Sequence, residues 1–161
     1  MKATSLGGGK YWLLTVDQKT KMKWTWILKN KSELKDKFLT FIKDLRSKHK
    51  IEIKKMRCDN AGKNKAFIKA CKKGGVGIHF KEMAPGTPQQ NGLVKRSFAT
   101  LYGQVRSMLN MVGVTKKKRK QLWAECASTA TKVENIMTNA LSKPTAYEAF
   151  YGAKASNAKH L

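Results

Sequence analysis

The sequence has few acidic residues, few cysteines and no long apolar run, and each shortage excludes something. Only 10 Asp and Glu oppose 34 Lys and Arg, which gives a formal net charge of +24 over 161 residues. Three cysteines without CxxC spacing do not make a disulfide framework, and the three histidines show no zinc-ligand spacing with them. No apolar run reaches the roughly eighteen residues of a membrane span, so no membrane partner is predicted. The N-terminus lacks the apolar stretch of a secretory signal, so none is expected.

The excess of positive charge predicts a polyanionic partner, and nucleic acid is the natural one. Arginine supplies only five of the cations. Because lysine acts as a hydrated point charge whereas arginine reads bases through a planar fork, this ratio favours contact with the phosphate backbone over sequence recognition. A solvated lysine-rich surface or cationic engineering is the alternative. A membrane surface is disfavoured because the lysines are spread along the whole chain.

The cysteine pattern predicts the cellular compartment, and the apolar content predicts a folded domain. Cysteines in odd number are typical of reduced thiols, which predicts an intracellular, reducing compartment and leaves mitochondrion, nucleus and cytosol open. Hydrophobic residues make up 41% of the chain, enough for a folded core rather than disorder. We therefore expect one domain over 1–161, with an N-terminal arm at 1–9, a core at 10–112, a C-terminal helix at 115–141 and a tail at 142–161.

Periodicity of the apolar residues predicts the elements of this domain. Alternation favours strands at 10–18, 22–29, 51–58 and 76–83, the first two forming a hairpin. Helical spacing favours helices at 33–48, around 64–71, at 94–112 and at 122–140, and the segment 84–92 is expected to be a loop. The helix at 94–112 is expected to have an apolar seam of Val94, Phe98, Leu101, Val105, Met108 and Val112. The expected seam of the helix at 122–140 is Leu122, Cys126, Thr129, Val133, Ile136 and Ala140. The resulting order, ββαβαβαα, predicts an α/β domain with a mixed sheet.

Five segments in this order resemble the catalytic core of copia-type retrotransposon integrases. They read GGGKYWLLTVD, WTWILKNKSE, RCDNAG, GIHFKEMAPGTPQQNGLVKRSFATLYGQVRSMLN and KPTAYEAFYG, and together they cover nearly the whole chain. The resemblance implies a ribonuclease-H-like fold, a mixed sheet with flanking helices.

The resemblance also implies a catalytic site that this sequence does not complete. The family uses two Asp and one Glu to hold two divalent metals for phosphodiester cleavage and strand transfer. Asp59 matches the second Asp, and thirty-five residues separate it from Lys95, which stands where the family has its Glu. An ammonium group does not coordinate Mg²⁺. Asp17 aligns with a position that is no metal ligand and is expected to be a turn residue. We therefore predict no catalytic residues, a vestigial Asp59, and no metal or cofactor.

The first Asp of the family lies on a central strand that this chain is expected to lack. Three arrangements would fill its place: direct pairing of the strands at 10–18 and 51–58, folding back of residues 1–7, or a strand donated by another chain. Because open ladders in a core are costly, neighbouring protein chains are predicted partners.

The favoured function is a catalytically inactive, domesticated integrase-like core that binds nucleic acid without sequence preference. RNA is favoured over DNA, within a large ribonucleoprotein such as a ribosome. The expected binding residues are the cluster at 116–120 and three cations of the helix at 94–112: Lys116, Lys117, Lys118, Arg119, Lys120, Lys95, Arg96 and Arg106.

Two other functions stay open at this point. One is an active, Mg²⁺-dependent polynucleotidyl transferase, or an inactivated engineered form of it, in which only residue 95 has been changed. The other is a protein-interaction module that displays its tryptophans. Aromatic residues at strand and helix spacing are more often core than surface, which disfavours the interaction module. These tryptophans are Trp12, Trp24, Trp26 and Trp123.

Overall fold

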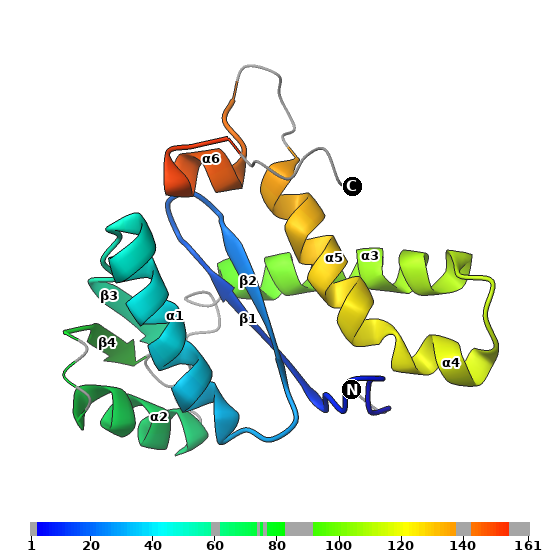
Figure 1. Ribbon diagram of the computed structural model, residues 1–161, viewed down its shortest axis with the longest axis horizontal. Helices are drawn as coiled ribbons and strands as arrows, with labels where there is room; N and C mark the ends of the chain where they lie inside the picture. The colour runs from blue at the N-terminus through cyan, green and yellow to red at the C-terminus, as the bar shows by residue number, and fades with distance from the viewer. Residues whose placement is uncertain are drawn as a thin grey trace. The chain divides into compact units, whose positions relative to one another are not determined.

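The chain forms two compact units in a computed structural model that describes residues 3–58, 62–73, 75, 77–82, 92–137 and 143–154. The first unit combines residues 1–29 with 93–161, and the second consists of 30–92 (Figure 1). The division into arm, core, C-terminal helix and tail within one domain stays a prediction.

The first unit begins with the predicted hairpin. Strands β1 (Tyr11–Val16) and β2 (Lys23–Leu28) pair antiparallel, with Tyr11 opposite Leu28 and Val16 opposite Lys23. Even-numbered residues of β1 point toward the core, and Leu14 is 8% exposed. Odd-numbered residues point to the other face, where Tyr11 and Leu13 are more than one third exposed. This alternation is what a strand with one buried face requires.

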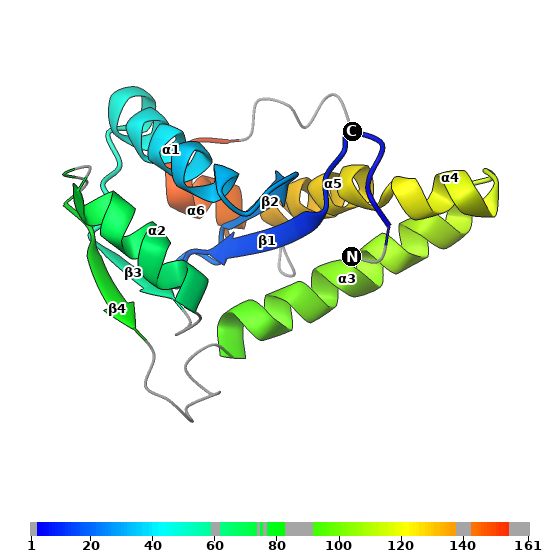
Figure 2. The same ribbon diagram turned by 90° about the horizontal axis from the view of Figure 1, so that it is seen from below.

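Four helices complete the first unit. α3 (Gly92–Met111) leads through α4 (Lys116–Gln121) into α5 (Trp123–Ile136), and α6 (Ala146–Tyr151) follows (Figure 2). The segment predicted as one helix at 115–141 is therefore two helices, because the helical backbone is interrupted at Leu122. The predicted tail contains α6, whose start is fixed by a capping box.

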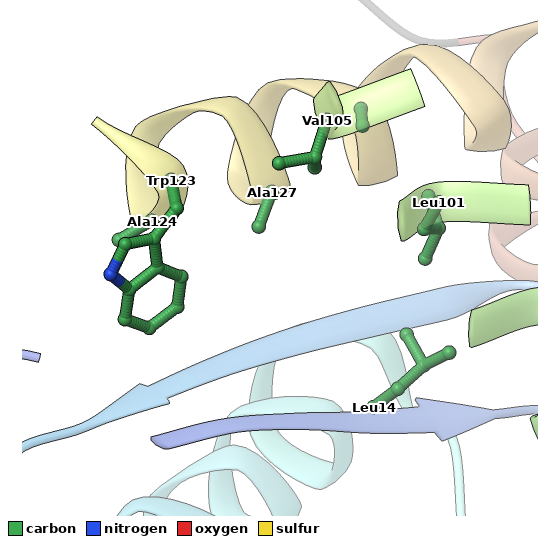
Figure 3. Packing of buried hydrophobic residues seen from close by; sticks show 7 residues of the cluster. Leu14, Leu101, Val105, Trp123, Ala124 and Ala127 are labelled. Carbon is green, nitrogen blue, oxygen red and sulfur yellow. The ribbon is translucent and has the colours of Figure 1, made fainter. Parts of the chain in front are cut away.

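The core of the first unit lies between the hairpin and α3 and α5. Figure 3 shows Leu14 of β1 pointing toward Leu101 and Val105 of α3 and toward α5. The predicted apolar seam of α3 is confirmed, since both of its central residues are at most 1% exposed. The predicted seam of α5 is wrong by about one residue. Its buried face consists of Trp123 and small residues that allow close packing: Ala124, Ala127, Ala130 and Thr131.

A buried polar network joins β2 to α5. The side chain of Asn135 accepts a hydrogen bond from the backbone N–H of Lys23 at 2.9 Å and donates one to its carbonyl at 2.8 Å. The ammonium of Lys23 lies 3.2 Å from Oε2 of Glu134, and the other carboxylate oxygen, Oε1, accepts a hydrogen bond from the side-chain amide of Gln104 at 2.5 Å. These bonds fix α5 against a strand end more than 100 residues away in sequence.

The second unit has its own parallel ladder. α1 (Glu33–His49) precedes β3 (Lys55–Cys58), and α2 (Gly62–Lys73) connects β3 to its parallel partner β4 (His79–Glu82). Its described buried side chains come from both helices, from the end of β3 and from the residue before β4: Phe38, Ile42, Leu45, Cys58, Phe67, Ile68, Cys71 and Ile78. The strand predicted at 51–58 is shorter than expected, because only its last four residues pair with β4.

The predicted α/β class is confirmed, and the described strands form two two-stranded sheets. Residues 3–7 do not fold back as a strand beside β1, which was one of the three expected arrangements. They form a turn closed by Ser5 and Gly9 instead. In the part of the chain that the structure describes, no helix is long and apolar enough to cross a membrane.

Candidate nucleic-acid interface

The start of α3 carries two exposed cations, Lys95 and Arg96. The first turn of this helix contains no acidic residue. A helix N-terminus has the positive end of the macrodipole, where acidic side chains stabilise and cations destabilise. Lys95 therefore occupies a position where local electrostatics disfavours it, and a bound anion would offset that cost.

An exposed stripe on α3 combines cations with an aromatic ring. Lys95, Tyr102 and Arg106 are seven and four residues apart, which places them on one side of the helix. Tyr102 is 42% exposed, and its ring stacks on that of Phe98 at 16° with centroids 6.5 Å apart. Phe98 in turn contacts Trp12 of β1, whose ring centroid is 4.6 Å away. The stripe thus rests on the core of the unit.

The three predicted cations of α3 do not all lie on the same side of the helix. Arg96 lies about 100° around the helix from Lys95, because each residue advances by that angle. Lys95 and Arg106 therefore lie on the same side of α3, and Arg96 lies on the neighbouring side. Sequence reasoning missed Tyr102, although its place seven residues after Lys95 was a signal that could have found it.

The basic cluster at 116–120 forms the short helix α4. Its N-cap is Thr115, whose hydroxyl accepts a hydrogen bond from the backbone N–H of Lys118 at 3.5 Å. Three lysines of α4 line an open hollow of about 530 Å³, together with Gln121 and two residues of the N-terminal arm. These lining residues are Lys116, Lys117, Lys120, Gln121, Ala3 and Thr4.

The other two members of the cluster do not line this hollow. Lys118 is exposed, and Arg119 is partly buried. The Nε of Arg119 is buried and has no hydrogen-bond partner within the described residues. The helical period separates the two sets, since 116, 117 and 120 fall within about 100° of one another. The helical period alone, which can be read from the sequence, predicts this separation of the cluster into two sets.

The N-terminal arm is held against α4 and α5 by hydrogen bonds. The indole N–H of Trp123 donates to the carbonyl of Ala3 at 2.9 Å, and the backbone N–H of Leu6 donates to that of Gln121 at 3.0 Å. The buried hydroxyl of Ser5 accepts from the backbone N–H of Gly9 at 2.8 Å. A side chain on Gly9 would lie 2.3 Å from Ile27 Cγ2, so this turn needs glycine.

The acids of the first unit mostly serve its own structure. Asp17 accepts bonds from the backbone N–H and hydroxyl of Thr20 at 2.7 and 2.8 Å, which confirms it as a turn residue. Glu134 pairs with Lys23, and Glu148 closes the capping box of α6. Glu125 is exposed in the first turn of α5. Few acids therefore remain to neutralise the basic surface.

The described residues do not gather a ligand set for the divalent metals that the family resemblance implies. Lys95, which the resemblance matches to the family's Glu, is exposed and carries an ammonium group, which does not coordinate Mg²⁺. Asp17 is engaged in its turn, and Asp59 lies outside the described residues. Among the residues that the structure describes, no three His, Cys, Asp or Glu side chains gather as ligands.

The four tryptophans differ in burial, and each makes contacts within the first unit. Trp123 is 1% exposed, and Trp12 packs against the core cluster. Trp24 meets the ring of Phe150 edge to face at 4.9 Å, and the indole N–H of Trp26 donates to Thr15 at 2.9 Å. The expectation of a core position is confirmed for Trp123 and Trp12. Trp24 and Trp26 pair with Thr15 and Leu13 on the other face of the hairpin and are partly exposed, so they are not part of this core.

Comparison with known proteins identifies relatives by sequence. The chain is 33% identical over 150 residues, 92% of its length, to the retrovirus-related Pol polyprotein from transposon TNT 1-94 of Nicotiana tabacum. It is 28% identical over 112 residues, 70% of its length, to that from transposon RE2 of Arabidopsis thaliana. The chain spans about one tenth of these polyproteins, 11% and 8%. No family model matches the chain.

Solved structures identify the fold. The catalytic core domain of BIV integrase gives a TM-score of 0.61 at 17% identity, covering 86% of this chain and 82% of that one. A chain of the simian T-cell lymphotropic virus intasome, in complex with PP2A regulatory subunit B56 gamma, gives 0.62 at 18% identity over 84% of this chain and 46% of that one. The ribonuclease-H-like fold expected from the sequence is thereby confirmed. The chain is a relative of retrovirus-related Pol polyproteins and has an integrase-like core.

Proposed function

We propose that this integrase-like core binds nucleic acid through the phosphate backbone and does not catalyse strand transfer. The observation that carries the proposal is Lys95. It is exposed in the first turn of α3, where the helix dipole disfavours a cation and where the related enzymes need a carboxylate. One substitution both removes a metal ligand and adds a group that attracts phosphate.

Two further features support phosphate binding. The formal charge of +24 is self-repelling unless a polyanion neutralises it. The basic residues of α3 and α4 are presented on folded helices whose backbones are fixed by packing and caps, so less entropy is lost when they bind. Since lysine dominates over arginine, base recognition is expected to contribute little.

The partner and the compartment belong to the same proposal. Single-stranded RNA and duplex DNA share the phosphodiester chemistry that these lysines recognise, and RNA within a ribonucleoprotein is the partner that we propose. The reducing intracellular compartment is proposed with it. No cofactor is part of this function.

Fluorescence anisotropy with labelled RNA and duplex DNA of mixed sequence tests the proposal. Binding to 6–10 phosphates would weaken by about 10³–10⁵-fold between roughly 50 and 200 mM salt. We expect a steep linear dependence of log Kd on log salt, no dependence on base sequence, and no change when EDTA is added. A flat salt dependence would contradict the proposal. Tighter binding of DNA than of RNA would contradict the RNA partner alone.

An active polynucleotidyl transferase is the second candidate, because the relatives found by sequence are retrovirus-related Pol polyproteins. The discriminating variant is Lys95→Glu, which restores the family's carboxylate. With Mg²⁺ or Mn²⁺ added, we expect no nicking of supercoiled DNA by this variant or by the natural chain. Nicking by the variant alone would indicate an otherwise intact site, and nicking by both would overturn the proposed loss of catalysis.

A further inference from the structure

The hollow beside α4 is distinct from the α3 stripe and is lined from two sides. Lys116, Lys117 and Lys120 line it from α4 and form its lysine wall, and Ala3 and Thr4 line it from the arm and form its arm wall. Among the residues that the structure describes, no acidic one lines it. Lys120 is four residues after Lys116 and three after Lys117, so it neighbours both of them on the helix surface.

Hydrogen bonds hold the arm wall in place. Three bonds hold it: Trp123 to Ala3, Leu6 to Gln121, and Gly9 to the 5%-exposed Ser5. Their partners lie on α4, on α5 and within the arm itself. The wall therefore has a fixed place relative to the lysines of α4.

The lysine wall is electrostatically costly without an anion. Like charges at i, i+3 and i, i+4 destabilise a helix by about 0.2–0.5 kcal/mol for each pair. Lys117 with Lys120 and Lys116 with Lys120 are two such pairs, and both lie in the hollow. An anion placed between them would interact favourably with all three ammonium groups at once.

We propose that this hollow is a phosphate site, in which the lysines bind one backbone phosphodiester of the nucleic acid and the arm completes the contact. Thr4 and Gln121 add a hydroxyl and an amide that can donate to phosphate oxygens. The inference rests on the proposed function and goes beyond it, because it assigns a binding role to Thr4, an uncharged residue of the arm. Ser5 and Gly9 act as positioning residues.

Matched triple variants test the lysine wall. The combined Lys116→Gln, Lys117→Gln and Lys120→Gln variant is compared with a control of equal charge, built at exposed lysines elsewhere in the same unit: Lys19, Lys132 and Lys154. Each lost phosphate contact lowers the salt slope by about 0.9 for duplex DNA. We expect the pocket variant to lose clearly more slope than the control. Equal losses would overturn the site.

Neutral variants test the arm wall without changing the net charge. Thr4→Val removes an exposed hydroxyl, and we expect about threefold weaker binding at unchanged melting temperature, as for one lost hydrogen bond. Ser5→Ala releases the arm and should weaken binding more, provided that circular dichroism shows a folded chain. Unchanged affinity in Thr4→Val would show that the arm is not part of the site, whatever the fate of Ser5→Ala.

The source of the phosphate is distinguished by competition at constant ionic strength. Inorganic tripolyphosphate should displace the labelled oligonucleotide from the natural chain more effectively than from the pocket variant. A chain that binds tripolyphosphate but no nucleic acid would overturn both the inference and the proposed function. A chain that binds nucleic acid with equal slopes in both triples would overturn the inference alone.

Discussion

Replacing Lys95 by Glu is expected to change stability and nucleic-acid affinity in opposite directions. Lys95 lies in the first turn of α3, a turn without any acid. A charge at this place is worth about 0.3–1 kcal/mol, and reversing its sign counts twice. The variant should therefore unfold with a free energy higher by about 0.6–2 kcal/mol at low salt. It also loses one phosphate contact, so its salt slope should fall by about 0.9.

The assay follows from the placement of the tryptophans. All four belong to the first unit, which also contains α3, so urea unfolding followed by tryptophan fluorescence reports on that unit. Lys132→Glu is the control, because it changes the net charge equally on the exposed side of α5. We expect it to lack the gain in stability and to change the slope less. Lower stability of Lys95→Glu, or a gain in stability at unchanged affinity, would refute the reasoning.

Three further predictions concern stability. Asn135→Ala leaves the buried N–H and carbonyl of Lys23 without partners and should cost about 2–5 kcal/mol by urea unfolding; a loss below about 1 kcal/mol would contradict the network. Gly9→Ala forces contact with Ile27 and should cost about 1–3 kcal/mol, whereas an unchanged midpoint would contradict that close approach. Burial raises the pKa of the Cys71 thiol in the folded chain. The free energy of unfolding should therefore fall as pH rises above the unfolded pKa of about 8.5, because the unfolded chain releases this proton more readily. Cys71→Ala should flatten the resulting fall in melting temperature at alkaline pH.

Much of the fold follows from the sequence because its signals are local. Alternation around Leu14 and the seam through Leu101 and Val105 mark the hairpin and α3 correctly. The face of α5 was misjudged because its buried residues are alanines, which carry little periodic signal. Ala127 and Ala130 are fully buried even so.

The candidate site was only partly predictable. The charge of the cluster at 116–120 is evident from composition, but which lysines share a hollow depends on the arm, more than 100 residues earlier in the chain. Bonds such as that from Trp123 to Ala3 have no signature in either segment. Asp17 was expected to be a turn residue, because the geometry of a hairpin turn is decided within a few residues.

The divided makeup of the first unit has a consequence for synthesis on the ribosome. Its hairpin is complete by residue 28, yet Trp123, which belongs to the same core cluster as Leu14, is added only 95 residues later. At about 5–20 residues per second, the hairpin waits roughly 5–20 s with its apolar side open to solvent. The continuous segment 30–92 can collapse during that interval. A nascent-chain chaperone would therefore meet the apolar side of the hairpin before the helices that cover it have been synthesised.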